Sequence, residues 1–326
     1  MLRRTLSRRY FLSLFSGSLS FLSLMPLSLT VASTQNSTDH SEASAGNGKK
    51  PTIGIALGAG GANGLAHILM LEALDELSLR PDYISGSSIG AIIGALYAAG
   101  MSGKQIRGEV EKFFLSPNEE LTEKLLNKDA IRWVEFLEID LGDGGLLSSE
   151  NFISFLYDLL KFETFEELEI PLKLTAADLW SHEQVILQSG PLLPAIKASM
   201  ALPGVFEPEI YNNRVLVDGG TVNPVPYDLL YPECDIVIGI DVGGQRSAPE
   251  TPGASYFETI FNSIKVMQQA IMDEKLKRKE PTIYLVPHIL DIRALEFYRA
   301  HEVFKQAYPA KRELKKQLVE LLNVQA

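Results

Sequence analysis

The sequence predicts an α/β fold with a mainly parallel central sheet and flanking helices. Short apolar runs typical of buried strands alternate with helical patterns along residues 52–100. Glycine-rich turns follow two of these runs. The second helical pattern is apolar nearly all round, as in a helix buried against a sheet. Strands and helices that alternate in this way favour a parallel sheet.

The elements follow in order from the first apolar run. Residues 52–57 predict a strand, and a glycine-rich turn occupies 58–64. Leucine and isoleucine then recur at helical spacing until Pro81 ends the run. A second strand is expected at 82–85 and a buried helix at 89–99.

The remainder continues the same mixture. Residues 103–170 are expected to form a helix-rich insertion that covers one end of the sheet. Further strands are expected at 172–177, 185–187, 215–217, 235–240 and 283–286. Helices are expected at 255–278 and from about Ile292 onward. The apolar stripe of 255–278 is expected to pack in the core; contact with acyl chains or a membrane is the alternative.

The first 32 residues differ from the rest of the chain. They contain four arginines, no acidic residue, and an apolar stretch followed by small residues, which is the order of an export signal. The string from Ser7 to Leu12 resembles a twin-arginine signal, so we expect a periplasmic or extracellular protein; an N-terminal membrane anchor is the alternative. Residues 33–50 predict a flexible tether, and 51–326 a single catalytic domain.

Charge and cysteine content exclude several classes. The formal net charge is -11, which disfavours a nucleic-acid partner because phosphate affinity comes from Lys and Arg. Without residues 1–32 the net charge becomes -15. This charge disfavours electrostatic attraction to anionic membranes, so transient membrane contact would depend on apolar surface. The single cysteine, Cys234, excludes an intrachain disulfide and a cysteine-rich metal site. No metal is expected, and the oligomeric state is left open.

Residues 86–90 have the spacing Gly-x-Ser-x-Gly between a predicted strand and a predicted helix. A nucleophile in this motif stands on a tight turn, so Gly86 and Gly90 must be nearly free of side chain. The spacing therefore selects Ser88 rather than Ser87, and places its hydroxyl above a helix N-terminus that favours developing negative charge. The alternative is a glycine turn that only packs the helix on the sheet.

The glycine-rich turn lies at the end of the neighbouring predicted strand. Its backbone N–H groups are candidate oxyanion donors, at Gly60, Gly61 and Ala62. The positions of Gly58, Gly60 and Gly64 do not fit Gly-x-Gly-x-x-Gly, because Asn63 takes the last place, and the lysine of a P-loop is missing. The sequence therefore predicts no nucleotide cofactor.

Asp218 ends a short predicted strand and precedes Gly219 and Gly220. A carboxylate with an ordinary pKa near ~3.9 becomes a competent base if a dry site raises that pKa. Asp-Gly-Gly alone also fits a hairpin turn. The chain order of a Ser–Asp–His triad is permitted, because His288 and His301 follow Asp218, but neither lies in a recognisable motif.

Four blocks in this order resemble the patatin-like phospholipases, at residues 57–67, 86–90, 198–206 and 218–226. The resemblance covers about 52–243. It implies a three-layer fold and a Ser–Asp dyad, with Ser88 as nucleophile, Asp218 as base and the glycine turn as oxyanion hole. It also implies that 198–206 shape the site and that ester-linked acyl chains are hydrolysed from lipids without metal or cofactor.

Two positions depart from the family pattern. Ala59 stands where members usually have glycine, and Asn63 where they usually have Arg or Lys. An amide can hydrogen-bond but cannot supply the charge of a cation. We therefore expect an enzyme with reduced or altered activity. A non-catalytic lipid-binding protein and a Ser–Asp–His esterase are the alternatives.

Overall fold

The computed structural model describes residues 50–115, 156–245, 247 and 256–323. The predicted export signal at 1–32 and the tether at 33–50, except for its last residue, lie outside these ranges, as do 116–155 of the predicted insertion. Export, tether and domain boundaries therefore stay predictions.

The described residues form an eight-stranded sheet in the order β5-β6-β3-β2-β1-β7-β8, with β4 also paired to β3. The strands are β1 (Ile53–Leu57), β2 (Tyr83–Ser87), β3 (Leu172–Asp178), β4 (Gln184–Leu187), β5 (Glu209–Tyr211), β6 (Arg214–Asp218), β7 (Ile236–Ile240) and β8 (Ile283–Leu285). Parallel pairing joins β3, β2, β1, β7 and β8, whereas β4, β5 and β6 pair antiparallel. The predicted α/β fold with a mainly parallel sheet is confirmed.

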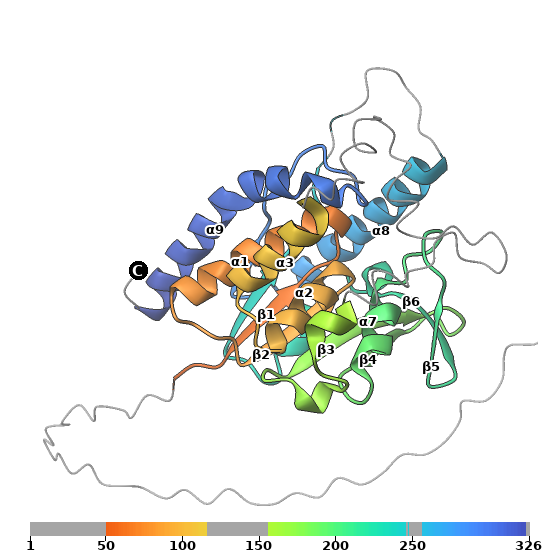
Figure 1. Ribbon diagram of the computed structural model, residues 1–326, viewed down its shortest axis with the longest axis horizontal. Helices are drawn as coiled ribbons and strands as arrows, with labels where there is room; N and C mark the ends of the chain where they lie inside the picture. Colours follow the sequence, from red (N-terminus) through yellow and green to blue (C-terminus); the bar gives the residue numbers. More distant parts are fainter. Residues whose placement is uncertain (1–49, 116–155, 246, 248–255, 324–326) are drawn as a thin grey trace, which may run out of the picture. The chain divides into compact units, whose positions relative to one another are not determined.

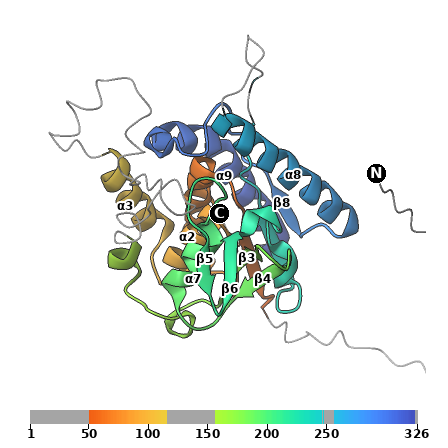
Figure 2. The same ribbon diagram turned by 90° about the vertical axis from the view of Figure 1, so that its right-hand side faces the viewer.

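Helices cover both faces of the sheet (Figures 1 and 2). The main helices are α1 (Ala66–Glu76), α2 (Ile89–Ala98), α3 (Gly103–Leu115), α7 (Leu192–Met200), α8 (Tyr256–Arg278) and α9 (Ala300–Leu322). Successive side chains of a strand point to opposite faces. Ile55 of β1 accordingly belongs to the larger core with α1, α2 and α9, whereas Ala56 packs in a smaller cluster with Met272 of α8.

Helix α8 differs from its sequence expectation. Of the predicted core stripe, Ile264 is buried, but Met267 keeps 55% of its surface exposed. Met272, in the second half of the helix, packs in the smaller cluster. Phe261, in the first half, lines a cavity and also packs against the cluster around Val205, so the core interpretation holds for Ile264 and is wrong for Met267. In the described ranges, no helix is both long enough and apolar enough to cross a membrane.

Candidate active site

Two strands meet end to end beside β3. Strand β4 pairs with residues 174–177 of β3. Strand β2 pairs with β3 up to Thr175, and β6 pairs with it from Ala176 onward. Strand β4 therefore occupies one edge of β3 on both sides of the point between Thr175 and Ala176. Strands β2 and β6 must then share the other edge of β3, and their carboxyl ends face each other there. Ser88 directly follows β2, and Asp218 is the last residue of β6.

Ser88 stands on a strained turn between β2 and α2. Its backbone has φ 56° and ψ −123°, a conformation that side-chain-bearing residues rarely adopt. A Cβ on Gly90 would lie 2.0 Å from the Leu57 carbonyl oxygen, and one on Gly86 would lie 2.6 Å from the Gly90 carbonyl oxygen. Both glycines are therefore needed to bring the turn this close to its neighbours.

Asp218 is buried beside this turn and is 2% exposed. It accepts a hydrogen bond from the Gly220 N–H at 2.7 Å, and the Ser88 hydroxyl lies near enough to lower the pKa of this carboxyl. Burial raises the pKa of Asp218 from its ordinary 3.8 to about 6, and the Ser88 hydroxyl and the Gly220 N–H offset only part of that increase. A Cβ on Gly219 would lie 2.1 Å from the Thr175 carbonyl oxygen, so the chain passes tightly over β3 here.

The glycine-rich turn after β1 lies beside the turn after β2 that carries Ser88. Strands β1 and β2 are parallel, with Leu57 opposite Gly86. Gly60 and Gly61 border the same cavity as Ser88, and their N–H groups have no acceptor among the described residues. Gly61 has φ +57°, and a Cβ there would lie 2.4 Å from the Ala294 carbonyl oxygen. These two N–H groups therefore remain candidates for oxyanion donors.

Ala62 does not fit its predicted role as an oxyanion donor. Its N–H donates to the Ala294 carbonyl oxygen at 2.7 Å, and the residue is fully buried. Gly58 and Gly64 serve packing: the Gly58 N–H donates to the Ile240 carbonyl oxygen, and a Cβ on Gly64 would lie 2.1 Å from Ile89.

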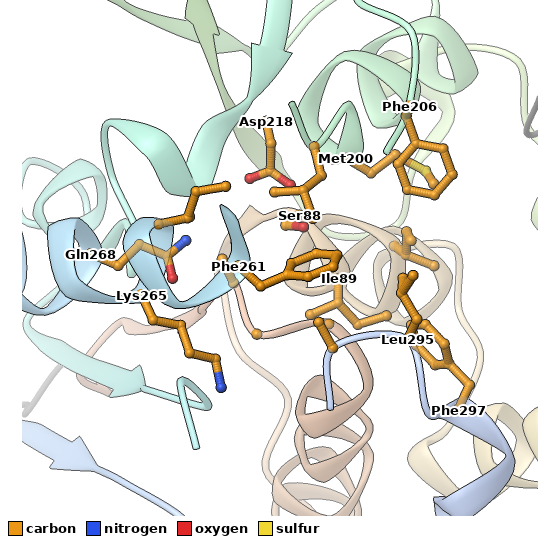
Figure 3. A pocket seen from close by; sticks show the side chains of 17 residues that line it. Ser88, Ile89, Met200, Phe206, Asp218, Phe261, Lys265, Gln268, Leu295 and Phe297 are labelled. Carbon is orange, nitrogen blue, oxygen red and sulfur yellow. The ribbon is translucent and has the colours of Figure 1, made fainter. Parts of the chain in front are cut away.

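A cavity of about 110 Å³ opens beside Ser88 and is lined mainly by apolar side chains. Figure 3 shows Phe206, Leu295 and Phe297 on one side of Ser88. Gln268 and Lys265 of α8 lie on the other side (Figure 3). Ser88 and Asp218 turn toward each other between these two regions (Figure 3).

None of the histidines in the described ranges lines this cavity. His182, His288 and His301 are exposed. His67 is fully buried, and its Nε2 lies 2.8 Å from the Gly58 carbonyl oxygen. Burial lowers the pKa of His67 to about 4, so it stays neutral near pH 7 and holds the glycine turn. His40 lies outside the described residues.

The two departures from the family pattern occupy different places. Ala59 lines the cavity. Asn63 is 1% exposed and donates weakly to the Gly243 carbonyl oxygen at 3.4 Å, so it packs behind the turn. The described residues contain no cluster of His, Cys, Asp and Glu suited to a metal ion.

The sequence interpretation missed several residues of the cavity wall. Lys265 and Gln268 lie one helical turn from Phe261 and Ile264 and line the cavity with them. The helical spacing of the apolar residues is a signal for this wall, but it predicts a core face equally well. The wall residues Ala294, Leu295 and Phe297 carried no motif. By contrast Met200, Leu202 and Phe206 belong to the block expected to shape the site, and they do line the cavity.

A serine on a strained strand–turn–helix, next to a buried carboxylate and a glycine-rich turn, is the arrangement of α/β proteins that carry the Gly-x-Ser-x-Gly elbow. Within that class the chain belongs to the patatin-like phospholipase family, whose model matches residues 55–231.

Relatives include an uncharacterised NTE family protein of Mycobacterium tuberculosis. It is 32% identical over 200 residues, which cover 61% of this chain and 51% of that protein. Lysophospholipase NTE1 of Kluyveromyces lactis is 26% identical over 78% of this chain and 18% of its own. The chain therefore spans about half the length of its mycobacterial relative and less of the yeast protein. VipD from Legionella pneumophila is similar in structure, with a TM-score of 0.43 and 15% identity over 82% of this chain and 67% of that chain.

Proposed function

We propose that this protein is a serine acyl hydrolase that cleaves ester-linked acyl chains from lipids through a Ser88–Asp218 dyad. One observation carries the proposal. A serine on a strained turn faces a buried carboxylate across one cavity wall (Figure 3), and burial raises the pKa of that carboxylate to about 6. A carboxyl group with a pKa near 6 is ionised at pH 7 yet basic enough to accept a proton during reaction.

The geometry supports a two-step mechanism. Asp218 takes the hydroxyl proton as Ser88 Oγ bonds to the ester carbonyl carbon, and the N–H groups of Gly60 and Gly61 stabilise the oxyanion. The carbon–oxygen bond to the leaving alcohol then breaks, and Asp218 returns the proton to that alcohol. Water attacks the acyl-enzyme with Asp218 again as base, which releases the fatty acid and restores the Ser88 hydroxyl. Covalent catalysis replaces one difficult step with two easier ones.

The cavity favours a lipid substrate. Its apolar side, formed by Phe206, Leu295 and Phe297 among others (Figure 3), suits a hydrocarbon chain. The opposite side, with Lys265 and Gln268, suits the polar part of the ester. The family name and the lysophospholipase among the relatives support the same class.

A fluorophosphonate probe tests the proposal, because it reacts with an activated serine. We expect labelling at Ser88, identified by peptide mass spectrometry, and release of fatty acid from a mixed lipid extract. A folded protein that neither takes the label nor releases fatty acid would instead be a lipid-binding protein on this fold.

The dyad predicts that the exposed histidines are dispensable. The double variant His288→Ala/His301→Ala is expected to keep kcat/KM for p-nitrophenyl esters within about twofold of wild type, because neither side chain lines the cavity. A loss on the order of 10⁴-fold, the scale of removing a triad member, would favour the Ser–Asp–His alternative.

A further inference from the structure

The end of α7 holds both halves of the dyad by their backbones. The N–H of Ser88 donates to the Oγ of Ser199 at 3.1 Å. The N–H of Asp218 donates to the carbonyl oxygen of Ala201 at 2.9 Å. The Ser199 hydroxyl and the Ala201 carbonyl, two residues apart on one segment, therefore bind the backbones at the facing ends of β2 and β6.

The Ser199 hydroxyl bonds to the backbone at the strained residue. Ser199 is fully buried, and an N–H group that loses its acceptor in such surroundings is costly. The bond directs the Ser88 N–H toward α7. It therefore favours the φ of 56° that presents the Ser88 side chain to Asp218.

The segment that carries this hydroxyl is itself held firmly. Helix α7 packs against β3, β6 and α2, and its buried side chains include Leu192, Ala195 and Ile196. Met200 lies between the two holding residues and lines the cavity. The same segment thus connects the cavity wall with the dyad.

We propose that Ser199 is a positioning residue, whose hydroxyl fixes the backbone of Ser88 and, together with the Ala201 carbonyl, sets the position of Ser88 relative to Asp218. The proposal rests on the proposed function. It predicts an effect on the chemical step, because a nucleophile displaced by about 1 Å can lose on the order of 100-fold in rate.

Kinetics of two Ser199 variants test the role of the hydroxyl. Ser199→Ala is expected to lower kcat for a p-nitrophenyl ester by about 10- to 100-fold with KM changed less than about twofold. Ser199→Thr, which keeps the hydroxyl, is expected to recover most of the lost kcat. Lys197→Ala is the matched control on α7, because Lys197 pairs with Glu209 and its loss is expected to leave kcat unchanged.

Crystal structures of wild type and Ser199→Ala give a readout that does not need activity. We expect the Ser88 φ to leave its left-handed value in the variant. An unchanged Ser88 backbone with unchanged kcat, or a Thr variant as impaired as the Ala variant, would overturn the positioning role. Wild type that hydrolyses no ester and takes no fluorophosphonate would instead overturn the proposed function, while the backbone comparison would still test the bond.

Discussion

Replacing Ser88 with alanine is expected to abolish hydrolysis of p-nitrophenyl esters and of phospholipid, with kcat reduced on the order of 10⁴-fold or more. The variant has no Oγ to attack the carbonyl carbon, so no acyl-enzyme can form. Alanine must also adopt the φ of 56°, so its melting temperature is measured beside its rate. Full esterase activity in folded Ser88→Ala would contradict the mechanism.

The adjacent serine offers a matched control. Ser87 is fully buried, and its hydroxyl has no hydrogen-bond partner among the residues that the structure describes. Ser87→Ala removes this unpaired polar group, and such a change is nearly neutral or stabilising. We therefore expect unchanged kcat and an undiminished melting temperature, so that a loss confined to Ser88→Ala reports on the nucleophile.

The elbow was predictable because its requirements are local. A tight turn leaves no room for side chains at positions 86 and 90, and the sequence has glycine at both positions around Ser88. The parallel strands were predictable for a similar reason, since apolar runs and glycine turns alternate along 52–100. Sequence patterns of this kind depend on neighbours within a few residues.

The proximity of Ser88 to Asp218 could not be predicted from the spacing of residues in the sequence. It depends on β6 pairing antiparallel with β3 at the point where β2 ends. This pairing places Asp218 near Ser88, although the two residues are 130 positions apart in the chain. Resemblance to a family suggested the pair, and the register explains it physically. The predicted oxyanion role of Ala62 is wrong for a comparable reason. Its N–H donates to the carbonyl oxygen of Ala294, a residue far away in the sequence.

Helix α8 shows a different limit of periodicity. A helical apolar stripe indicates that one face avoids water, but it does not identify what covers that face. Phe261 and Ile264 face the cavity beside Ser88, and Met267 faces outward. A buried core and an apolar cavity therefore produce the same apolar periodicity in the sequence.

Replacing Asp218 with asparagine is expected to remove activity as thoroughly as replacing Ser88, because an amide cannot accept the hydroxyl proton. Wild-type kcat/KM is expected to rise with pH through a midpoint near 6, where the Asp218 carboxyl loses its proton. Measurement of kcat/KM for a p-nitrophenyl ester from pH 4.5 to 8, in steps of about half a unit, checks both statements. A variant that hydrolyses esters at the wild-type rate would place the base elsewhere.

The same substitution is expected to increase stability above pH 6. The pKa of Asp218 is about 6 in the folded protein and 3.8 ordinarily, so the unfolded chain releases this proton at lower pH than the folded chain. Below pH 4 the carboxyl is neutral in both the folded and the unfolded chain, and the free energy of unfolding carries no cost for a buried charge. As the pH rises to 6, the unfolded chain ionises first, and the free energy of unfolding falls. Above pH 6 the buried charge costs about 3 kcal/mol, a cost that asparagine avoids.

Urea unfolding of wild type and Asp218→Asn at pH 4 and pH 8 tests this. The variant is expected to be more stable by an amount that is largest at pH 8 and disappears near pH 4. Asp178→Asn is the control of opposite sign, because the N–H groups of Trp180 and Ser181 lower the pKa of Asp178, and its loss is expected to destabilise the protein at pH 8. A less stable Asp218→Asn at pH 8 would mean that the carboxylate is kept for the fold. A more stable, inactive one would mean that the fold tolerates a buried charge because the reaction needs a base there.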